Sequence, residues 1–204
     1  MKKLSIILLS CLLCAATHAQ SGTTGDLSWS ISDSTLTISG TGAMPDYHAY
    51  SPPPWQYIDS FSNVVIGYGV SSIGIFAFYF GNNFNSITIS NSVTTIRNWA
   101  FSWGYLISIT IPSSVTTIGD YAFFKCYDLT SVTIPNSATY IGKGAFGDCR
   151  SLSKIVNHAT KPQTIDVSVF EELDTTAITL RVPAASVAAY QAAEVWKEFQ
   201  IEGF

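Results

Sequence analysis

The sequence predicts a mainly β solenoid with short helical turns, made of about 4–5 stacked coils with a 22–23-residue period. A β-hairpin is expected to cover its N-terminal end and a helical segment its C-terminal end. Three observations predict this architecture: an Ala-Phe pair recurs at a nearly constant spacing, apolar residues alternate within each recurring unit, and the two ends depart from the repeat. A single unit is too small to bury its own apolar residues, so neighbouring units are expected to share one continuous core.

The Ala-Phe pairs set the period of the repeat. Successive pairs lie 23, 22 and 23 residues apart. An earlier copy of the unit begins at Phe84, a looser one at Phe61 and a degraded one at Leu152. Since the flanking residues recur in the same register, the pairs indicate one repeating structural element. The pairs are Ala77-Phe78, Ala100-Phe101, Ala122-Phe123 and Ala145-Phe146.

One unit contains a short strand and a turn. Val132 and Ile134 alternate with polar residues, as in a strand with one buried face. Pro135 ends that strand because proline has no N–H to donate to a sheet. Ser137, at the ninth position of the unit, is expected to hydrogen-bond neighbouring backbone through its hydroxyl. Gly142 then permits a turn before the next Ala-Phe pair.

The two ends are expected to cap the solenoid. The alternating residues 27–38, with a turn at Asp33-Ser34, predict a β-hairpin, and the proline-rich residues 51–55 predict a stiff connector. Pro183 fits the first turn of a helix that runs to about Glu198. Three side chains of that helix are expected to face the last coil: Val187, Tyr190 and Trp196.

The first residues predict export. Lys2 and Lys3 precede an apolar stretch too short to span a bilayer as a helix, and Ala19 fits a cleavage site before Gln20. A second interpretation treats Cys11 as the lipidated residue of a bacterial lipobox. Both interpretations place the protein at the cell surface, in the medium or in the periplasm, and no other segment is long and apolar enough to cross a membrane.

The predicted organisation has four segments and no linker that would separate two domains. They are a signal peptide (1–19), an N-terminal cap with the proline-rich connector (20–60), the repeats (61–151), and a degraded repeat with the C-terminal cap (152–204).

The repeat resembles a known family. The pattern Leu-x-x-Ile-x-Ile-Pro-x-Ser-Val-x-x-Ile-Gly-x-x-Ala-Phe-x-x-Cys is similar to the BspA-like (Bacteroides surface protein A) type of leucine-rich repeat. The segment from Leu36 to Trp55 resembles the lead-in of that family, and the segment from Leu180 to Phe199 resembles its ending. The resemblance implies an extracytoplasmic protein of host-associated bacteria whose relatives include adhesins for host matrix proteins. It supplies no fixed functional motif.

Composition narrows the class of function. The chain is 47% hydrophobic and only 12% charged, with a formal net charge of −4, which argues against disorder and against nucleic-acid binding. A catalytic site is not expected, because His48 and His158 lie in opposite end regions and no catalytic or phosphate-binding motif occurs. No cofactor and no metal are expected, since the acidic run Glu171-Glu172 is typical of solvated surface.

Cys126 and Cys149 occupy the same position in successive units, where earlier units have glycine at 81 and 104. Two interpretations are open. Adjacent coils can bring two cysteines within disulfide reach, or the cysteines can be stacked buried thiols, which is the favoured hypothesis.

Three sets of residues are candidates for ligand binding, because equal positions of a solenoid form stripes along its surface. Each stripe also has a purely structural interpretation, as half-exposed strand residues or as a cover over the core. The first aromatic stripe is Phe76, Trp99 and Tyr121; the second aromatic stripe is Phe80 and Trp103, with Tyr105 and Tyr127 nearby; the threonine stripe is Thr88, Thr110 and Thr133.

Three functions remain open at this level. The first is a non-catalytic binding protein for a host matrix or cell-surface protein. The second is a glycan-binding module that stacks sugars on Trp99, Trp103 and Tyr121. The third is a structural component of the cell envelope. The sequence leaves the ligand and the oligomeric state undetermined.

Overall fold

The computed structural model describes residues 20–80 and 84–204, so the predicted signal peptide, Cys11 and position 81 lie outside the described residues. Its strands are β1 (Gln20–Thr24), β2 (Leu27–Ser32), β3 (Thr35–Gly40), β4 (Gly42–Ala43), β5 (Asn63–Ile66), β6 (Val70–Ile73), β7 (Ser86–Ile89), β8 (Thr95–Ile96), β9 (Ser108–Thr110), β10 (Thr117–Ile118), β11 (Ser131–Ile134), β12 (Tyr140–Ile141), β13 (Lys154–Asn157), β14 (Thr179–Val182) and β15 (Gln200–Gly203). Its helical elements are η1 (Val167–Phe170), η2 (Thr175–Ala177), η3 (Ala184–Ser186), α1 (Val187–Ala192) and η4 (Trp196–Glu198).

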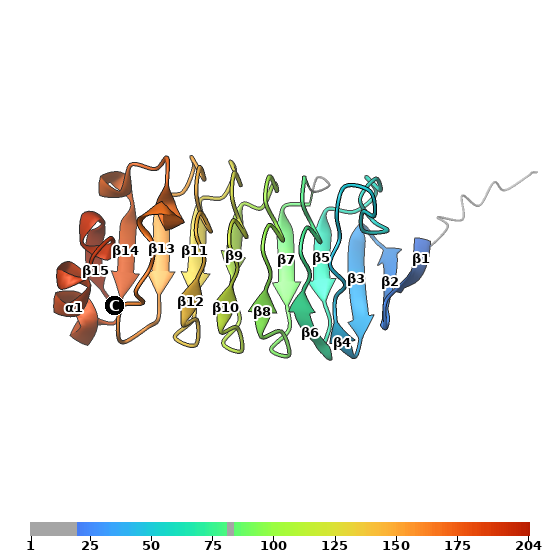
Figure 1. The fold of residues 1–204 in the computed structure, drawn as a ribbon, viewed down its shortest axis with the longest axis horizontal. Coiled ribbons are helices and arrows are strands. Elements are labelled where there is room, and N and C mark those ends of the chain that lie inside the picture. Colours follow the sequence, from blue (N-terminus) through green and yellow to red (C-terminus); the bar gives the residue numbers. More distant parts are fainter. Residues whose placement is uncertain (1–19, 81–83) are drawn as a thin grey trace, which may run out of the picture.

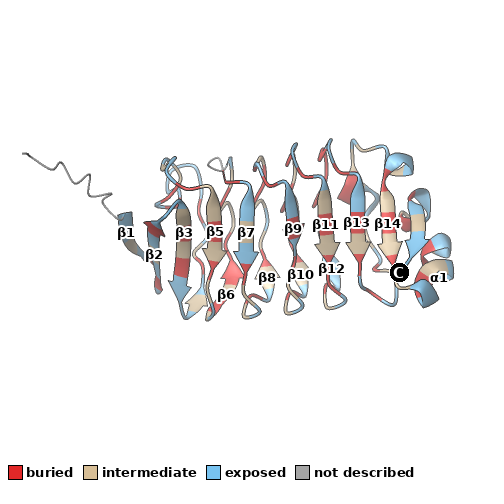
Figure 2. Ribbon diagram, turned by 180° about the vertical axis from the view of Figure 1, so that it is seen from behind, coloured by how far each residue is buried: buried red, intermediate tan, exposed pale blue. Residues whose placement is uncertain are grey.

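The coils stack in single file along one long axis (Figure 1). The first strand of each coil pairs in parallel with the equivalent strand of the next, in the orders β3-β5-β7 and β9-β11-β13-β14-β15. The second strands form a further parallel sheet, in the order β4-β6-β8-β10-β12. The predicted mainly β solenoid is confirmed. Buried positions alternate with half-buried ones in strands such as β5 and β11, as expected for a structure with one buried side (Figure 2).

The ladder of the first strands is interrupted between β7 and β9. This break coincides with the one step of 22 residues between Ala-Phe pairs. In the next unit Tyr127 and Leu129 are separated by Asp128, whereas Tyr105 is followed directly by Leu106. The missing residue lies just before β9, so the chain enters this strand without the extra length that the other coils have.

A column of stacked phenylalanine rings fills the centre of the solenoid. Centroids of neighbouring rings lie 5.2–5.3 Å apart, with interplanar angles of 4–8°. Trp55 continues the column at the N-terminal end, 5.7 Å from its first ring, and Phe170 continues it at the C-terminal end, 5.8 Å from its last. The second residue of every Ala-Phe pair is therefore a core residue. The central rings are Phe78, Phe101, Phe123 and Phe146.

A ladder of serine hydroxyls ties successive coils together, as the ninth position of the unit predicts. Ser92 donates its hydroxyl hydrogen to the carbonyl of Val70 at 2.8 Å. Ser137 donates in the same way to Val115 at 2.7 Å. Each hydroxyl gives a hydrogen-bond partner to a backbone carbonyl of the preceding coil. A carbonyl in a turn beside the core needs such a partner because the regular ladder supplies none there.

The predicted N-terminal hairpin is present, and it is larger than expected. β2 pairs antiparallel with β3 around Asp33 and Ser34, and β1 adds a third antiparallel strand that the sequence analysis missed. β3 also pairs in parallel with β5. The hairpin is thus continuous with the solenoid, because one of its strands serves as the first strand of the stack.

The predicted single helix to Glu198 is wrong. The chain forms η3, α1 and η4 in succession, and a left-handed residue, Val195 with φ of 69°, separates α1 from η4. The chain then adds β15 in parallel to β14, which covers an edge that a longer helix would have left open. Tyr190 and Trp196 are fully buried against the last coil, as expected, and Val187 packs beside them.

Removing one ring from the central column tests its contribution. Phe123→Ala is expected to lower the free energy of unfolding by about 3–5 kcal/mol, because the ring is fully buried and stacked on both faces. Urea unfolding followed by circular dichroism measures the change. Thr110→Ala, on the exposed side of β9, serves as the control and is expected to change it by less than about 0.5 kcal/mol. Similar losses in both variants would contradict a dominant role of the column.

Candidate functional site

Both aromatic stripes stand on backbone in the left-handed region. Trp99 and Trp103 each have φ of 60°, a conformation that costs an L-residue about 1–2 kcal/mol. It also turns each amide toward the next coil: Trp99 N–H donates to the carbonyl of Asp120 at 3.0 Å, and Trp103 N–H to that of Phe124 at 2.8 Å. The same geometry recurs at Asp148 in a later coil. The strain therefore belongs to the coil itself and is not a sign of catalysis.

The rings of the first aromatic stripe cover one another. Trp99 stacks on Tyr121 with centroids 4.4 Å apart, and Phe76 stacks on its other face at 6.1 Å. Both faces of the Trp99 indole are therefore occupied, and the half-exposed stripe presents ring edges to solvent. A sugar that stacks on an aromatic platform needs an open face.

The second aromatic stripe begins as aromatic and ends as cationic. Phe80 is 61% exposed and stacks on Trp103 at 5.5 Å. The Nζ of Lys125 lies over the Trp103 ring, 4.4 Å from its centroid. Tyr127 meets the edge of Trp103 at 5.8 Å, and Tyr105, in the preceding coil, is 49% exposed.

The first stripe stops in the fourth coil for a packing reason. A Cβ atom on Gly144 would lie 2.3 Å from Cε1 of Tyr121, so the tyrosine ring occupies the space of a side chain at that position. A Cβ atom on Gly147 would lie 2.8 Å from Cγ of Glu171 and 3.0 Å from Cδ2 of Phe124. The Tyr121 ring, the last of the first stripe, thus occupies the space that the missing side chain of Gly144 leaves open.

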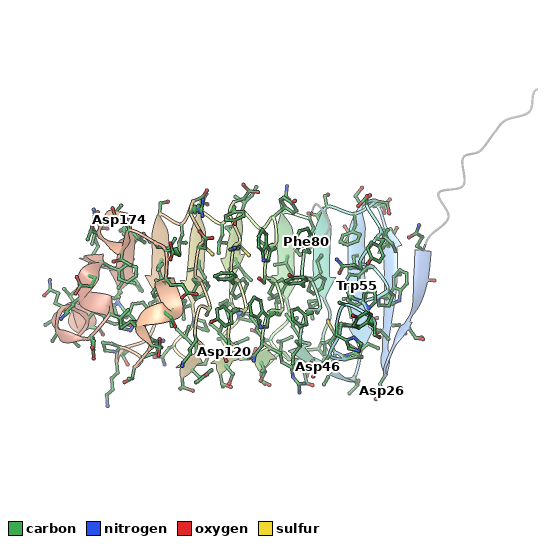
Figure 3. The ribbon with its side chains drawn as sticks, turned by 45° about the horizontal axis from the view of Figure 1, so that its top comes forward. Asp26, Asp46, Trp55, Phe80, Asp120 and Asp174 are labelled. Atoms are coloured by element: carbon green, nitrogen blue, oxygen red, sulfur yellow. The ribbon has the colours of Figure 1, made fainter. Side chains whose placement is uncertain are left out.

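A cavity of about 500 Å³ opens where the stripes begin. One wall is the connector that follows the hairpin, and the other is the coil segment that carries the first ring of each stripe. Figure 3 shows rows of side-chain rings along the solenoid and labels Phe80, with Trp55 lying further toward the N-terminal end. The connector contributes Tyr47, His48, Ala49, Pro52, Pro53, Gln56 and Tyr57, and the coil contributes Phe76, Tyr79 and Phe80.

Specific hydrogen bonds hold the connector in place. Asp46 accepts from the amide of Ile75 at 2.8 Å and forms an ion pair with Arg97 at 2.6 Å. The indole of Trp55 donates to the carbonyl of Ala77 at 2.9 Å. The side-chain amide of Gln56 donates to the carbonyl of Tyr79 at 3.0 Å, and both residues line the cavity. The cavity is therefore a fixed feature of the fold.

The sequence analysis found the stripes but missed the connector wall. The sequence predicts residues 51–55 only as a stiff connector, and it gives His48 no partner for a shared catalytic site. Also missed were Tyr79 and Phe124, which lie between the two stripes and contact the first at 5.0 and 5.4 Å. Their position, two residues after each alanine, recurs in the sequence and could have been found. The wall could not, because it depends on how the connector docks.

The threonine stripe lies elsewhere. Thr88 and Thr110 are exposed and Thr133 is half-exposed, and all three belong to the first-strand sheet rather than to the segments that carry the rings. The structure therefore does not join the threonine stripe to the aromatic cavity.

The two cysteines are free, buried thiols. Cys126 donates to the carbonyl of Phe101 at 3.1 Å, and Cys149 donates to that of Phe123 at 3.0 Å. The neighbouring Cys126 side chain, and to a lesser extent burial, raise the pKa of Cys149. In the part of the chain that the structure describes, no three His, Cys, Asp or Glu side chains gather into a metal-binding group.

Comparison with known proteins places this geometry in a family. The model for the BspA type leucine-rich repeat region matches residues 55–178 with six copies. The chain belongs to the BspA type leucine-rich repeat family. Comparison with curated proteins gives no match.

Solved structures of bacterial leucine-rich repeat proteins share the fold. A leucine-rich repeat protein from Eubacterium ventriosum is 25% identical with a TM-score of 0.58, and 81% of this chain covers 55% of that one. The pneumococcal vaccine antigen PcpA is 19% identical with a TM-score of 0.66, over 84% of this chain and 42% of the antigen. This BspA type chain thus spans about half the length of both. The leucine-rich repeat protein of T. pallidum is 24% identical with a TM-score of 0.50, over 67% and 71%.

None of the helices within residues 20–80 and 84–204 has the length and hydropathy needed to cross a bilayer.

The docked connector is expected to loosen at alkaline pH. Burial raises the pKa of Tyr47, whose hydroxyl bonds Thr24 at 2.7 Å, to about 12, against 10.0 for an unperturbed tyrosine. Burial also raises the pKa of Tyr190. Between about pH 10 and 12 the Tyr47 hydroxyl ionises in the unfolded chain but stays neutral in the folded chain, so the free energy of unfolding falls as the pH rises. Urea unfolding across this range measures it. In Tyr47→Phe the free energy of unfolding is expected to fall less steeply with pH. An unchanged slope would contradict the raised pKa of Tyr47 as a cause of the alkaline destabilisation.

Proposed function

We propose that this BspA type protein is an exported, non-catalytic binding protein that recognises a partner protein through its aromatic face. The aromatic face is defined as the cavity together with the two aromatic stripes. The observation that carries the proposal is the cavity of about 500 Å³ that opens directly onto partly exposed rings. Concave apolar sites with a few polar groups are the usual form of binding sites, and aromatic residues are enriched in protein interfaces.

Export is supported by the sequence of the first residues and by the family. The basic residues, short apolar stretch and small residues at 17–19 form a signal-peptide pattern. Attachment of the chain to a membrane through Cys11 is the alternative route to the surface. The absence of a catalytic role is supported by the family, whose repeats are built for recognition.

The ring geometry favours a protein partner over a sugar. Trp99 is covered on both faces, and Trp103 is covered by Phe80 on one side and by the Lys125 ammonium on another. Ring edges carry a partial positive charge that suits carbonyl and carboxylate oxygens. Edges are therefore suited to contacting a polypeptide backbone, whereas stacked sugars require faces.

A binding screen with a matched pair of variants tests the proposal. The purified chain is passed over immobilised host matrix proteins and over a panel of polysaccharides. Phe80→Asn removes an exposed ring from the cavity and keeps a residue that tolerates the left-handed conformation. It is expected to weaken binding to a protein partner about tenfold or more.

Tyr68→Asn is the control, since Tyr68 is an exposed tyrosine that lies outside the cavity. It is expected to bind as the unchanged chain does, with circular dichroism confirming that both variants fold. If Phe80→Asn and Tyr68→Asn bind the partner equally well, the aromatic face is not the binding surface. Binding to polysaccharides alone would replace the protein partner with a glycan.

A further inference from the structure

The far end of the second stripe carries a positive charge that the described residues leave without a counter-ion. Lys125 Nζ lies 4.4 Å from the centroid of Trp103 and 5.3 Å from that of Phe124. In residues 20–80 and 84–204, no carboxylate forms an ion pair with it. Asp148, which occupies the position of Lys125 in the next coil, is already paired with Arg150 at 2.6 Å. A lysine held over a ring in this way is available to an anionic group of a ligand.

The near end of the same stripe is apolar and concave. Phe80 forms part of the cavity wall and also stacks on Trp103, so the cavity and the charged end belong to one continuous track. The opposite wall of the cavity consists of Pro52, Pro53 and neighbouring connector residues. The track therefore runs from an apolar pocket, across ring edges, to a cation.

The spacing along the track selects a backbone conformation. The Phe80 and Trp103 ring centroids lie 5.5 Å apart, and Lys125 Nζ lies 4.4 Å from the Trp103 centroid, so the apolar end and the charged atom lie at most about 10 Å apart. In a polyproline II helix, residues three apart point to the same side and are separated by about 9 Å. In a β-strand, residues three apart point to opposite faces, and those two or four apart lie about 7 or 13 Å apart. The polyproline II helix fits the track best.

The rings beside the track suit the same ligand. A polyproline II segment has no internal hydrogen bonds, so its carbonyl oxygens are free to meet the partly exposed rings beside the track, Tyr105 and Tyr127. Prolyl rings pack into grooves lined by aromatic side chains, and the preformed helix loses little entropy on binding.

We propose that the cavity and Lys125 form a site for an acidic polyproline II segment of the partner protein. A prolyl residue occupies the cavity beside Phe80, and an aspartate or glutamate three residues along the segment pairs with the ammonium of Lys125. The inference rests on the proposed function, which it deepens by naming the chemistry of the partner.

Synthetic peptides test the spacing directly. The probe is a set of short proline-rich peptides in which one glutamate moves step by step away from a fixed proline, with glutamine versions as neutral controls. Fluorescence anisotropy measures their binding to the full chain. The peptides with glutamate three residues from the proline are expected to bind most tightly, about fivefold better than their glutamine versions, which is the upper range for a partly exposed ion pair.

Variants of the chain complete the cycle. Lys125→Gln is expected to remove the advantage of glutamate over glutamine, while Lys154→Gln, an exposed lysine on β13, leaves it intact. The double-mutant cycle isolates the pair because neither single change removes the apolar contact. Phe80→Asn is expected to weaken glutamate and glutamine peptides alike.

Several results would overturn the proposal. They are binding that does not depend on the position of glutamate, an advantage for glutamate that survives in Lys125→Gln, and no binding of any peptide. If a matrix protein still binds and still loses affinity in Phe80→Asn, only the peptide inference fails. If matrix proteins also bind equally to Phe80→Asn and Tyr68→Asn, the proposed function fails with it.

Discussion

The structure depends on one repeated contact, the stacking of the phenylalanine that follows each alanine on its counterpart in the next coil. Ring centroids 5.2–5.3 Å apart come close to the spacing of about 4.8 Å between parallel strands. The core and the strand ladders therefore impose the same register. Even where the first-strand ladder is interrupted between β7 and β9, Phe78 and Phe101 stay stacked with an interplanar angle of 4°. The ring column and the uninterrupted second-strand sheet thus carry the solenoid across a coil that is one residue short.

This constraint also shapes the outer surface. Because each coil repeats the one before it, residues two before and two after the core phenylalanine stack as well, on backbone that points their amides at the next coil. Stacking occupies ring faces and leaves ring edges outside. The same geometry supports the proposed protein partner, because ring edges suit carbonyl and carboxylate oxygens whereas a stacked sugar needs an open ring face.

The symmetry of the repeat ends at the connector, and the candidate site lies there. A strictly periodic solenoid offers the same shallow surface in every coil. The connector docks through Asp46, Trp55 and Gln56 onto the coil that carries Phe76 and Phe80, and it adds a second wall. The cavity of about 500 Å³ then forms between this coil and the connector. The charged end of the track is equally local, since the stripe positions change from Trp103 to Lys125 within one step.

The period, the stacking of the coils, the serine ladder and the core positions of the repeat can be predicted from the sequence, because each depends on neighbours at a fixed spacing. The covering of the ring faces, the place of the cavity and the closure of the C-terminal end depend on the tertiary structure. Ring faces are covered by residues 22–23 positions away, and the cavity wall comes from a non-repeating segment that no period describes. Residues 183–204 break into short helices before β15 because the open edge of β14 needs a partner, and that edge exists only once the coils have stacked.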